Sequence, residues 1–530
     1  MAKKKEVVYL VNAANDIGMA AIANDYSFPA LGVLALGTWL KQRIPDLEVI
    51  VRDGGVHSHD KVIEDIYDYA PSIVGVSVLG TSYQNALQIA ETAKAIGATT
   101  IFGNDQAAQL SRKIIQNRPV VDYVIGSEYG EESLELLVRH ELGENVPLEA
   151  IPHLTWSDGV TKGFDYETQM KTLSLLGSNL DKTGKRWEAL DVFPIVDRTL
   201  YPQEHWESYL QNYLSTFAEL HVEPEALAKL RKQFPNRLID NHPERNAYKK
   251  RAIEEAKKNV IGVSTMNRAR GCSRASDTRK CKFCDMYLDP VSSSPEMFWR
   301  EAKTANEQVG ANVLYEVCDS LSSFPKFLRD VAKSRPNTLG FEPQFFVYAQ
   351  AVDLVRNPDI VKYFQDMGVF RANIGLESFS NPTLKHMKGE GDSVEKNYQA
   401  LQMLKDAGIH VYGSLVLGSE AETPKTLRET VQGAKRIMDG GLVADIEAQP
   451  VLPLPNNVYG RKLYQAGLFP GGNKTDWPVN TDEVSRIYID NFSGISHRQA
   501  IEAAREIRNY ARAKGINFGS GVSKESQYSE

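Results

Sequence analysis

The residues most able to carry chemistry are the four cysteines of this 530-residue chain. Cys272, Cys281 and Cys284 follow the pattern Cys-x8-Cys-x2-Cys, whereas Cys318 stands apart inside an apolar, strand-like run. A large chain without secretory features has little use for disulfides, so clustered thiols indicate a metal or redox site. Three thiolates on one loop suit a four-iron cluster in which the protein holds three irons and the fourth iron stays open to an outside ligand.

A structural zinc site is the alternative interpretation of these cysteines. Such a site needs four Cys or His ligands, and no histidine lies between His242 and His386. Cys318 would therefore have to be the fourth ligand, although its apolar surroundings favour a packed core thiol. A chain that binds no metal is the third interpretation.

The composition of the chain excludes several classes of protein. Hydrophobic residues make up 42% and charged residues 24%, as in an ordinary globular protein, which excludes a disordered, collagenous or disulfide-built chain. The net charge of −7 gives no reason to expect nucleic acid as a partner. No apolar run reaches the ~18 residues of a transmembrane helix, and the start of the chain lacks the pattern of a secretory signal. We expect a cytoplasmic protein of about three to four domains.

Residues 1–145 alternate short β-branched runs with amphipathic stretches. The expected strands are Val7–Val11, Leu47–Arg52, Ile73–Val78, Thr99–Phe102 and Tyr123–Ile125. The expected helices are Leu31–Lys41, Asp60–Tyr69, Tyr83–Ile96, Gln106–Gln116 and Glu131–His140. This alternation predicts a doubly wound, flavodoxin-like (Rossmann-type) α/β domain that binds its ligand at the carboxyl ends of parallel strands. The first turn lacks Gly-x-Gly-x-x-Gly, so a dinucleotide is not expected.

The second half of the chain shows the same alternation and must position the cysteines. The expected strands are Asn259–Thr265, Val313–Val317, Thr338–Phe341, Phe370–Leu376, His410–Leu417 and Asp445–Pro450. The expected helices are Pro295–Glu307, Lys326–Lys333, Asp353–Met367, Val394–Ala407 and Pro424–Met438. Six such units predict a partial (β/α)6, TIM-like barrel, whose active site lies at the carboxyl ends of the strands. The cysteines follow the first of these strands.

Several motifs resemble those of cobalamin-dependent radical SAM enzymes. Phe28–Leu36 is similar to the Pro-x-Leu-Gly segment that opens their cobalamin-binding domain, and Pro71–Ser77 and Val121–Glu128 also resemble that domain. The resemblance implies that cobalamin is lined by Ser77, Leu79, Thr81, Gly103, Asn104, Gly126 and Glu128. Gly18 stands where some cobalamin proteins carry a cobalt-binding histidine, so no imidazole is expected from that position.

The second half resembles the radical SAM domain of the same family. Arg270-Gly271-Cys272 and Cys281-Lys282-Phe283-Cys284 match its cluster motif, except that eight residues replace the usual three in the first gap. Ala372–Ser378 and Gly413–Gly418 resemble two of its strands. The resemblance implies that Cys272, Cys281 and Cys284 hold a [4Fe-4S] cluster as the catalytic centre. It implies that S-adenosylmethionine (SAM) is bound by Phe283, Glu316, Glu377, Ser378, Ser414 and Gly418.

These observations predict four regions. They are a cobalamin-binding domain over residues 1–145, a linker with an inserted helical subdomain over 146–258, a radical SAM partial barrel over 259–456 and a mostly helical C-terminal region over 457–530.

The resemblance implies an enzyme that uses a [4Fe-4S] cluster, SAM and cobalamin. We expect methyl transfer from methylcobalamin to an unactivated carbon, or to phosphorus, after a 5′-deoxyadenosyl radical has abstracted hydrogen. The substrate would be a small molecule or a peptide, and flavodoxin or ferredoxin would donate electrons. A non-methylating rearrangement or cyclisation with the same cofactors is the alternative. Two further alternatives are a non-catalytic cobalamin sensor and a zinc-binding module.

Overall fold

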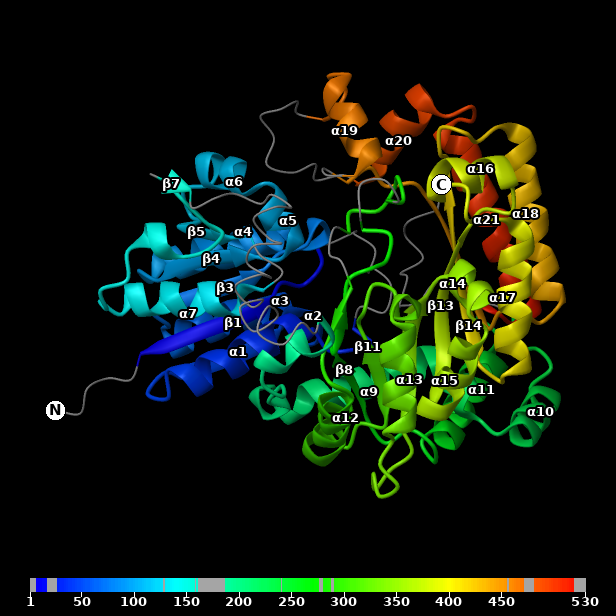
Figure 1. Ribbon diagram of the computed structural model, residues 1–530, viewed down its shortest axis with the longest axis horizontal. Coiled ribbons are helices and arrows are strands. Elements are labelled where there is room, and N and C mark those ends of the chain that lie inside the picture. Colours follow the sequence, from blue (N-terminus) through cyan, green and yellow to red (C-terminus); the bar gives the residue numbers. More distant parts are fainter. Residues whose placement is uncertain are drawn as a thin grey trace. The chain divides into compact units, whose positions relative to one another are not determined.

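The computed structural model describes residues 6–16, 26–126, 129–157, 159–160, 186–239, 241–275, 280–286, 290–454, 457–470 and 481–518. The chain divides into two compact units (Figure 1). Unit 1 comprises Met1–Ala21, Pro29–Ser208 and Pro470–Val479. Unit 2 comprises Ile22–Phe28, Tyr209–Phe469 and Asn480–Glu530.

Unit 1 is built on a seven-stranded sheet in the order β2-β1-β3-β4-β5-β6-β7. Its strands are β1 (Val7–Asn12), β2 (Glu48–Asp53), β3 (Ile73–Ser77), β4 (Thr99–Gly103), β5 (Tyr123–Ile125), β6 (Leu154–Trp156) and β7 (Gly159–Val160). The first five pair in parallel, which confirms the doubly wound sheet, while β6 and β7 extend it antiparallel. In this order β1 lies between β2 and β3, and the switch point falls between β1 and β3, where a crevice opens at the carboxyl ends of the strands.

The helices of unit 1 follow the predicted amphipathic stretches, except for one divided helix and the short α2, which was not predicted. They are α1 (Leu31–Arg43), α2 (Gly54–His57), α3 (His59–Tyr69), α4 (Tyr83–Ala95), α5 (Asp105–Gln109), α6 (Ser111–Asn117) and α7 (Gly130–Glu141). The single helix expected over Gln106–Gln116 is two helices, α5 and α6, which are interrupted at Leu110.

Unit 2 is built on seven parallel strands in the order β16-β15-β14-β13-β12-β11-β8. Their bounds are β8 (Val263–Met266), β11 (Val313–Glu316), β12 (Gln344–Ala349), β13 (Val369–Glu377), β14 (His410–Leu417), β15 (Asp445–Pro450) and β16 (Asn517–Phe518). Two short strands, β9 (Ala269–Arg270) and β10 (Val291–Ser292), pair antiparallel beside this sheet. Consecutive parallel strands joined by helices confirm the predicted partial barrel.

One predicted strand of this sheet is wrong. Thr338–Phe341 is a turn, in which Gly340 adopts a left-handed φ of +88° that no extended strand contains. Pro343 follows, and the strand β12 begins only after it, at Gln344. The aromatic and β-branched run Phe345–Tyr348 carries the strand propensity that the sequence analysis overlooks.

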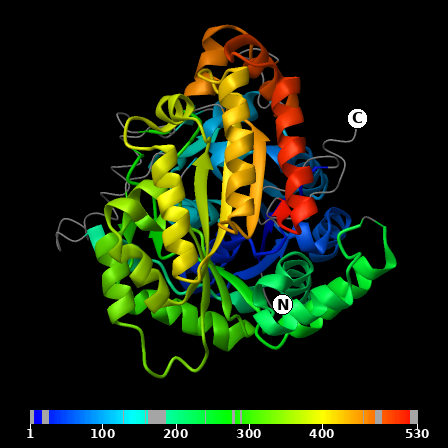
Figure 2. The ribbon, with the colours of Figure 1, turned by 90° about the vertical axis from the view of Figure 1, so that its right-hand side faces the viewer.

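The helices of unit 2 connect and cover its strands. Before the sheet come α9 (Gln203–Phe217), α10 (Pro224–Gln233) and α11 (Pro243–Ala256). Within the sheet come α12 (Pro295–Val309), α13 (Pro325–Lys333), α14 (Ala351–Arg356), α15 (Asp359–Met367), α16 (Asn381–Lys388), α17 (Val394–Asp406) and α18 (Pro424–Asp439). After β15 come α19 (Val458–Gln465), α20 (Thr481–Phe492) and α21 (His497–Lys514). Figure 2 shows α17, α18 and α21 side by side across the sheet.

The helices of unit 2 differ from the expected ones at one position. The helix expected over Asp353–Met367 is two helices, because Pro358 disfavours a helical conformation at Asn357. Within 202–258 the described residues include α9, α10 and α11, and one of the points at which the chain passes from one unit to the other, after Ser208, lies inside the expected linker. The functional domain boundaries stay a prediction. Within the described residues, no helix combines the length and the apolar character that crossing a membrane requires.

A buried ion pair lies in the interior of the unit 2 sheet. Arg371 of β13 and Asp445 of β15 approach to 2.9 Å, and neither side chain has exposed surface. The guanidinium also lies 4.3 Å from the ring centroid of Phe217 and 4.5 Å from that of Phe346. Burying one charge without its partner is costly, so this pair ties β13, β15 and α9 together.

We expect Asp445→Asn to destabilise unit 2 by about 3–5 kcal/mol, because it leaves a buried, uncompensated arginine. Chemical denaturation of the apoprotein, followed by circular dichroism, measures the change. Asp366→Asn is the matched control, since its i,i+4 partner Lys362 is solvent-exposed, and we expect it to cost less than about 1 kcal/mol. Equal losses of unfolding free energy in the two variants would show that the buried pair stabilises the protein no more than the exposed pair does.

Candidate active site

The three clustered cysteines lie on a loop at the carboxyl end of the first strand of unit 2. The chain leaves β8, forms β9 and turns at Gly271, whose φ of +94° places it in the left-handed region. The Gly271 N–H donates to Asp319 Oδ2 at 2.9 Å. Cys272 and Cys284 are half-buried and Cys281 is buried. The loop therefore carries three partly shielded thiols beyond the carboxyl end of β8.

The three thiols are close enough to affect one another electrostatically. Burial raises the pKa of Cys272 to about 11 and that of Cys284 to about 12, and the charge of Cys281 adds to both increases. Among the described residues, no three Cys, His, Asp or Glu side chains converge on a point where they could hold one metal ion. A [4Fe-4S] cluster gives each cysteine its own iron, so its ligands surround the cluster and do not meet at one atom. The donor set fits such a cluster.

Two distant helices hold the second half of this loop. The Lys282 N–H donates to the Met387 carbonyl of α16 at 2.9 Å, and the Lys282 carbonyl accepts from the Val458 N–H of α19 at 3.0 Å. Asn457, which has no exposed surface, donates from Nδ2 to the Phe283 carbonyl at 2.9 Å. The sequence analysis misses Asn457, because nothing local indicates that the start of α19 lies against residues 282–283.

Hydrogen-bond donors approach two of the cysteine sulfurs. The Arg274 N–H and the Gln350 side-chain amide donate to Cys272 Sγ at 3.4 and 3.3 Å. The Met286 N–H donates to Cys284 Sγ at 3.4 Å. Donors to a thiolate favour its charged form. The sequence analysis does not identify Gln350, because it places the strand at Thr338–Phe341. Gln350 directly follows the actual strand, β12.

Cys318 stands apart from this set. It is 1% exposed, and its Sγ donates to the Gly271 carbonyl at 3.7 Å. The thiol is therefore packed beneath the turn that leads into Cys272, as expected for a core cysteine.

Glu377, at the end of β13, is held in a strained backbone conformation. Its φ of +56° is uncommon for a non-glycine residue and costs about 1–3 kcal/mol. Its Oε1 lies 3.2 Å from Lys388 Nζ, which also donates to the Gly375 carbonyl at 2.8 Å. Burial opposes charge on Lys388, but Glu377 and Cys281 raise its pKa above the ordinary value. Lys388 therefore stays a cation beside the cysteine loop.

Glu316 and Ser378 are buried, and their side chains bond to other groups of the protein. Glu316 has no exposed surface, and its Oε1 accepts from the backbone N–H groups of Arg268 and Ala269 at 2.8 and 3.1 Å. Ser378 Oγ lies 2.7 Å from Thr430 Oγ1 of α18. Their roles toward SAM stay a prediction, whereas these contacts stabilise the turn before the cysteines and the end of β13.

The other residues assigned to SAM lie along the carboxyl-end half of the sheet. Phe283 is half-buried on the cysteine loop, and Ser414 of β14 lies in register between Gly375 and Glu447. Gly418 turns with a φ of +94°, and its N–H donates to Glu422 Oε2 at 2.5 Å. The structure thus brings Phe283, Glu377, Ser414 and Gly418 to one end of the barrel.

The residues assigned to cobalamin lie at the carboxyl edge of the unit 1 sheet. Asn104 Nδ2 donates to Ser77 Oγ at 3.1 Å, and Thr81 Oγ1 donates to Asn15 Oδ1 at 2.8 Å. The Leu79 N–H donates to Ser82 Oγ at 3.0 Å. Gly103 ends β4 and Gly126 follows β5. Glu128 lies outside the described residues, and the other six share this edge.

The same edge contains small residues and neutral polar groups. A Cβ at Gly126 would lie at ordinary contact distance from the His153 carbonyl, 3.6 Å, and from Ala108, 3.7 Å. The hydroxyl and amide groups offer donors and acceptors to an amide-bearing ligand such as cobalamin. The residues fit that cofactor. Asp16, which the sequence analysis leaves out, accepts from the Gln84 and Asn85 N–H groups and holds the first turn onto α4.

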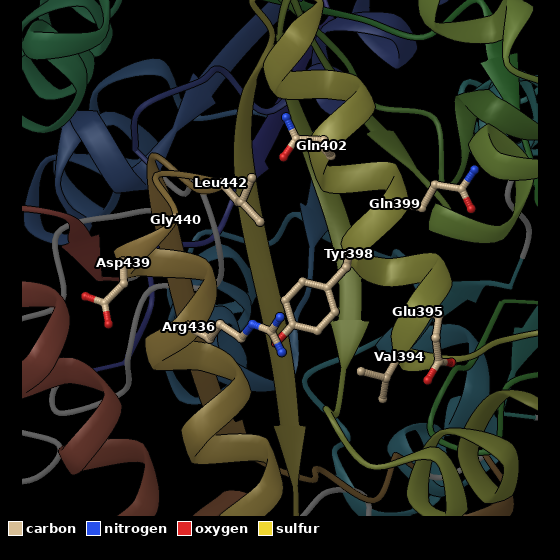
Figure 3. Close-up of a pocket in the computed structure, with 9 residues that line it drawn as sticks. All are labelled: Val394, Glu395, Tyr398, Gln399, Gln402, Arg436, Asp439, Gly440 and Leu442. Atoms are coloured by element: carbon tan, nitrogen blue, oxygen red, sulfur yellow. The ribbon is translucent and has the colours of Figure 1, made fainter.

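A pocket of about 950 Å³ lies elsewhere, between α17 and α18 (Figure 3). Its lining includes Tyr398 and Arg436, whose guanidinium lies 5.0 Å from the tyrosine ring centroid. The lining contains none of the residues assigned to a cofactor. It is a groove between helices and does not belong to the site at the strand ends.

Comparison with known proteins agrees with both halves of this description. The B12 binding domain model matches residues 19–138, and the Radical SAM superfamily model matches residues 266–433. A parallel barrel whose first strand leads into three cysteines, together with a B12-binding α/β domain, defines a class of enzymes that pair a cobalamin domain with a radical SAM domain. The chain belongs to the cobalamin-dependent radical SAM family, whose cofactors are a [4Fe-4S] cluster, SAM and cobalamin.

Solved structures share this fold. The radical SAM methyltransferase TsrM from Kitasatospora setae, with cobalamin and a [4Fe-4S] cluster bound, is similar with a TM-score of 0.61 and 14% identity, over 95% of this chain and 91% of TsrM. The cobalamin-dependent S-adenosylmethionine radical enzyme OxsB is similar with a TM-score of 0.53 and 16% identity, over 97% of this chain and 62% of OxsB.

Two curated relatives are anaerobic magnesium-protoporphyrin IX monomethyl ester cyclases. The protein from Cereibacter sphaeroides is 21% identical over 79% of this chain, and the protein from Rubrivivax gelatinosus is 25% identical over 33% of it. The matches span 58% and 30% of the lengths of these two relatives.

We expect Cys272→Ala, Cys281→Ala and Cys284→Ala each to abolish stable cluster binding, because each removes one of the three predicted iron ligands. Iron and acid-labile sulfide per chain, measured after anaerobic reconstitution, check this. Cys318→Ala is the control and should load as the wild type does. Full iron in any one of the three variants would overturn that ligand assignment.

We expect the stability of unit 2 to fall as the pH rises from about 4.5 to about 8, because burial raises the pKa of Glu316 from 4.5 to about 8. Over that window the unfolded carboxyl is ionised while the folded one still holds its proton, so unfolding becomes more favourable by a few kcal/mol. Urea midpoints measured at pH 5, 7 and 8.5 report the slope. Glu316→Gln should remove this component, and parallel pH curves for the two proteins would contradict the assignment.

Proposed function

We propose that the protein is a cobalamin-dependent methyltransferase that acts on an unactivated carbon, or on phosphorus, of its substrate. The observation that supports this most is the loop with three thiols at the barrel end, in a chain that also carries a B12-binding domain. A non-catalytic cobalamin sensor would have no use for such a loop. A zinc module would need a fourth ligand, and Cys318 bonds to the Gly271 carbonyl instead.

The chain's own residues have defined tasks in this proposal. Cys272, Cys281 and Cys284 would hold the cluster, and Phe283, Glu377, Ser414 and Gly418 are the proposed SAM contacts. When bound, the cluster and SAM supply a carbon radical, and cobalamin supplies the transferable methyl group. Lys388, kept cationic by Glu377, neutralises negative charge beside Cys281. The ion pair also holds the end of β13 against the end of α16.

The proposal extends to organisation and partners. Residues 1–145 would bind cobalamin, residues 259–456 would perform the radical chemistry, residues 146–258 would connect them and residues 457–530 would complete the barrel end. Asn457 of the last segment donates to the Phe283 carbonyl, which supports a role for that segment in holding the loop. The substrate would be a small molecule or a peptide, and a cytoplasmic flavodoxin or ferredoxin would supply electrons.

A second candidate function is ring formation without methyl transfer. It is favoured by the two curated relatives, both of which are cyclases. The same loop, barrel and B12-binding domain would serve it, because both reactions begin with a substrate radical. The two candidates differ in their products and not in their cofactors.

We expect the anaerobically reconstituted enzyme to cleave SAM to 5′-deoxyadenosine when it is given a reductant, and Cys281→Ala to lose this activity. Liquid chromatography with mass spectrometry quantifies 5′-deoxyadenosine and S-adenosylhomocysteine, with and without added cobalamin. With a panel of candidate substrates, methyl transfer predicts a product heavier by one methyl group and equimolar S-adenosylhomocysteine. Cyclisation predicts neither. A Cys281→Ala variant that still cleaves SAM would end the proposal.

A further inference from the structure

The enlarged gap of the cysteine motif contains an arginine that contacts three separate elements. Arg274 Nε donates to Gln350 Oε1 at 2.5 Å, and its Nη1 donates to the Lys388 carbonyl at 2.6 Å. Its Nη2 pairs with Asp392, whose side chain is 4% exposed. One guanidinium therefore joins the loop to the ends of β12 and α16 and to the segment before α17.

The contact with Gln350 determines which way the amide of that residue points. An arginine has only donors, so the oxygen of the amide must face it. The NH2 group is then directed to the other side, where it donates to Cys272 Sγ at 3.3 Å and to Ser320 Oγ at 3.1 Å. Gln350 is 8% exposed, and its own N–H donates to Ser322 Oγ at 2.9 Å. The side chain is fixed at both of its ends.

A fixed donor at a cluster ligand has an electronic consequence. Reduction adds one electron, and part of the added charge resides on the cysteine sulfurs. A hydrogen bond to such a sulfur stabilises the reduced state, and the low polarity of a buried site strengthens that bond. Removing the donor should therefore make the cluster harder to reduce.

We propose that Gln350 tunes the reduction potential of the cluster through Cys272 and that Arg274 is a positioning residue that acts through Gln350. The inference rests on the proposed function only in that the three cysteines hold a cluster. It assigns a task to Arg274, the second residue of the eight-residue gap, which orients the amide. The positive charge of Arg274 also favours the reduced state, so the experiment must separate charge from orientation.

Gln350→Met keeps the length of the side chain but removes the donor. We expect its cluster, reconstituted in the full chain without SAM or cobalamin, to have a lower midpoint potential, by about tenfold in the reduced-to-oxidised ratio, or ~59 mV for a one-electron couple. An EPR-monitored redox titration measures this. Gln365→Met is the matched control, because the Gln365 amide donates to the Ala407 carbonyl at an exposed position, and its potential should equal that of the wild type.

Arg274→Lys separates orientation from charge, because lysine keeps the positive charge but not the guanidinium geometry. We expect a shift in the same direction as for Gln350→Met, and no further shift when the two substitutions are combined. Additive shifts would overturn the claim that Arg274 acts through Gln350. An unchanged potential in Gln350→Met would overturn the tuning itself.

Failure to load iron is also informative. If Gln350→Met and Arg274→Lys both take up no cluster while the wild type does, the pair is needed for assembly and the tuning proposal is wrong. If the wild type itself takes up no cluster, the proposed function fails, and that result is distinct from a loaded cluster whose potential does not move.

Discussion

Hydrogen bonds from elements far away in the sequence place the described parts of the cysteine loop. The carbonyl of Met387 and the N–H of Val458 pair with Lys282 from two different helices, while Asn457 bonds to the Phe283 carbonyl. Arg274 fastens the other half of the loop. Because the ends of α16, α19 and β12 must all be in place for these bonds, the geometry of the thiols depends on the whole barrel end.

Buried charge is the second constraint at this end of the barrel. Arg274 pairs with Asp392, and Lys388 pairs with Glu377. Each pair places a cation near the cysteines together with a carboxylate, so neither charge of the pair is buried without its partner. The strained backbone of Glu377 is consistent with this arrangement, since the left-handed residue at the end of β13 brings its carboxylate to Lys388.

Prediction from sequence succeeded for most helices and strands and failed for the contacts between distant parts of the chain. Periodicity located most strands and helices to within a few residues, because alternating and helical patterns are local. It failed at Thr338–Phe341, where Gly340 and Pro343 form a turn, and at Asn357, where a proline divides a helix. Gln350 was missed for the same reason, since its position at a strand end depends on β12. Asn457 was missed because its contacts with residues 282–283 bridge a sequence distance that no local pattern records.

The sequence by itself determined the class of chemistry and the order of the parts. The cysteine triad and the two series of alternating strands and helices are readable from residue types and spacing, and the B12-binding motifs from their resemblance to a known family. Only the tertiary structure decided which side chains support the triad. It showed that Cys318 packs beneath the loop, that Oε1 of Glu316 accepts from two backbone N–H groups, and that Gln350 accepts from Arg274 while it donates to Cys272. Spacing encodes contacts along one element, whereas these contacts arise where parallel strands from distant parts of the chain end at a common edge.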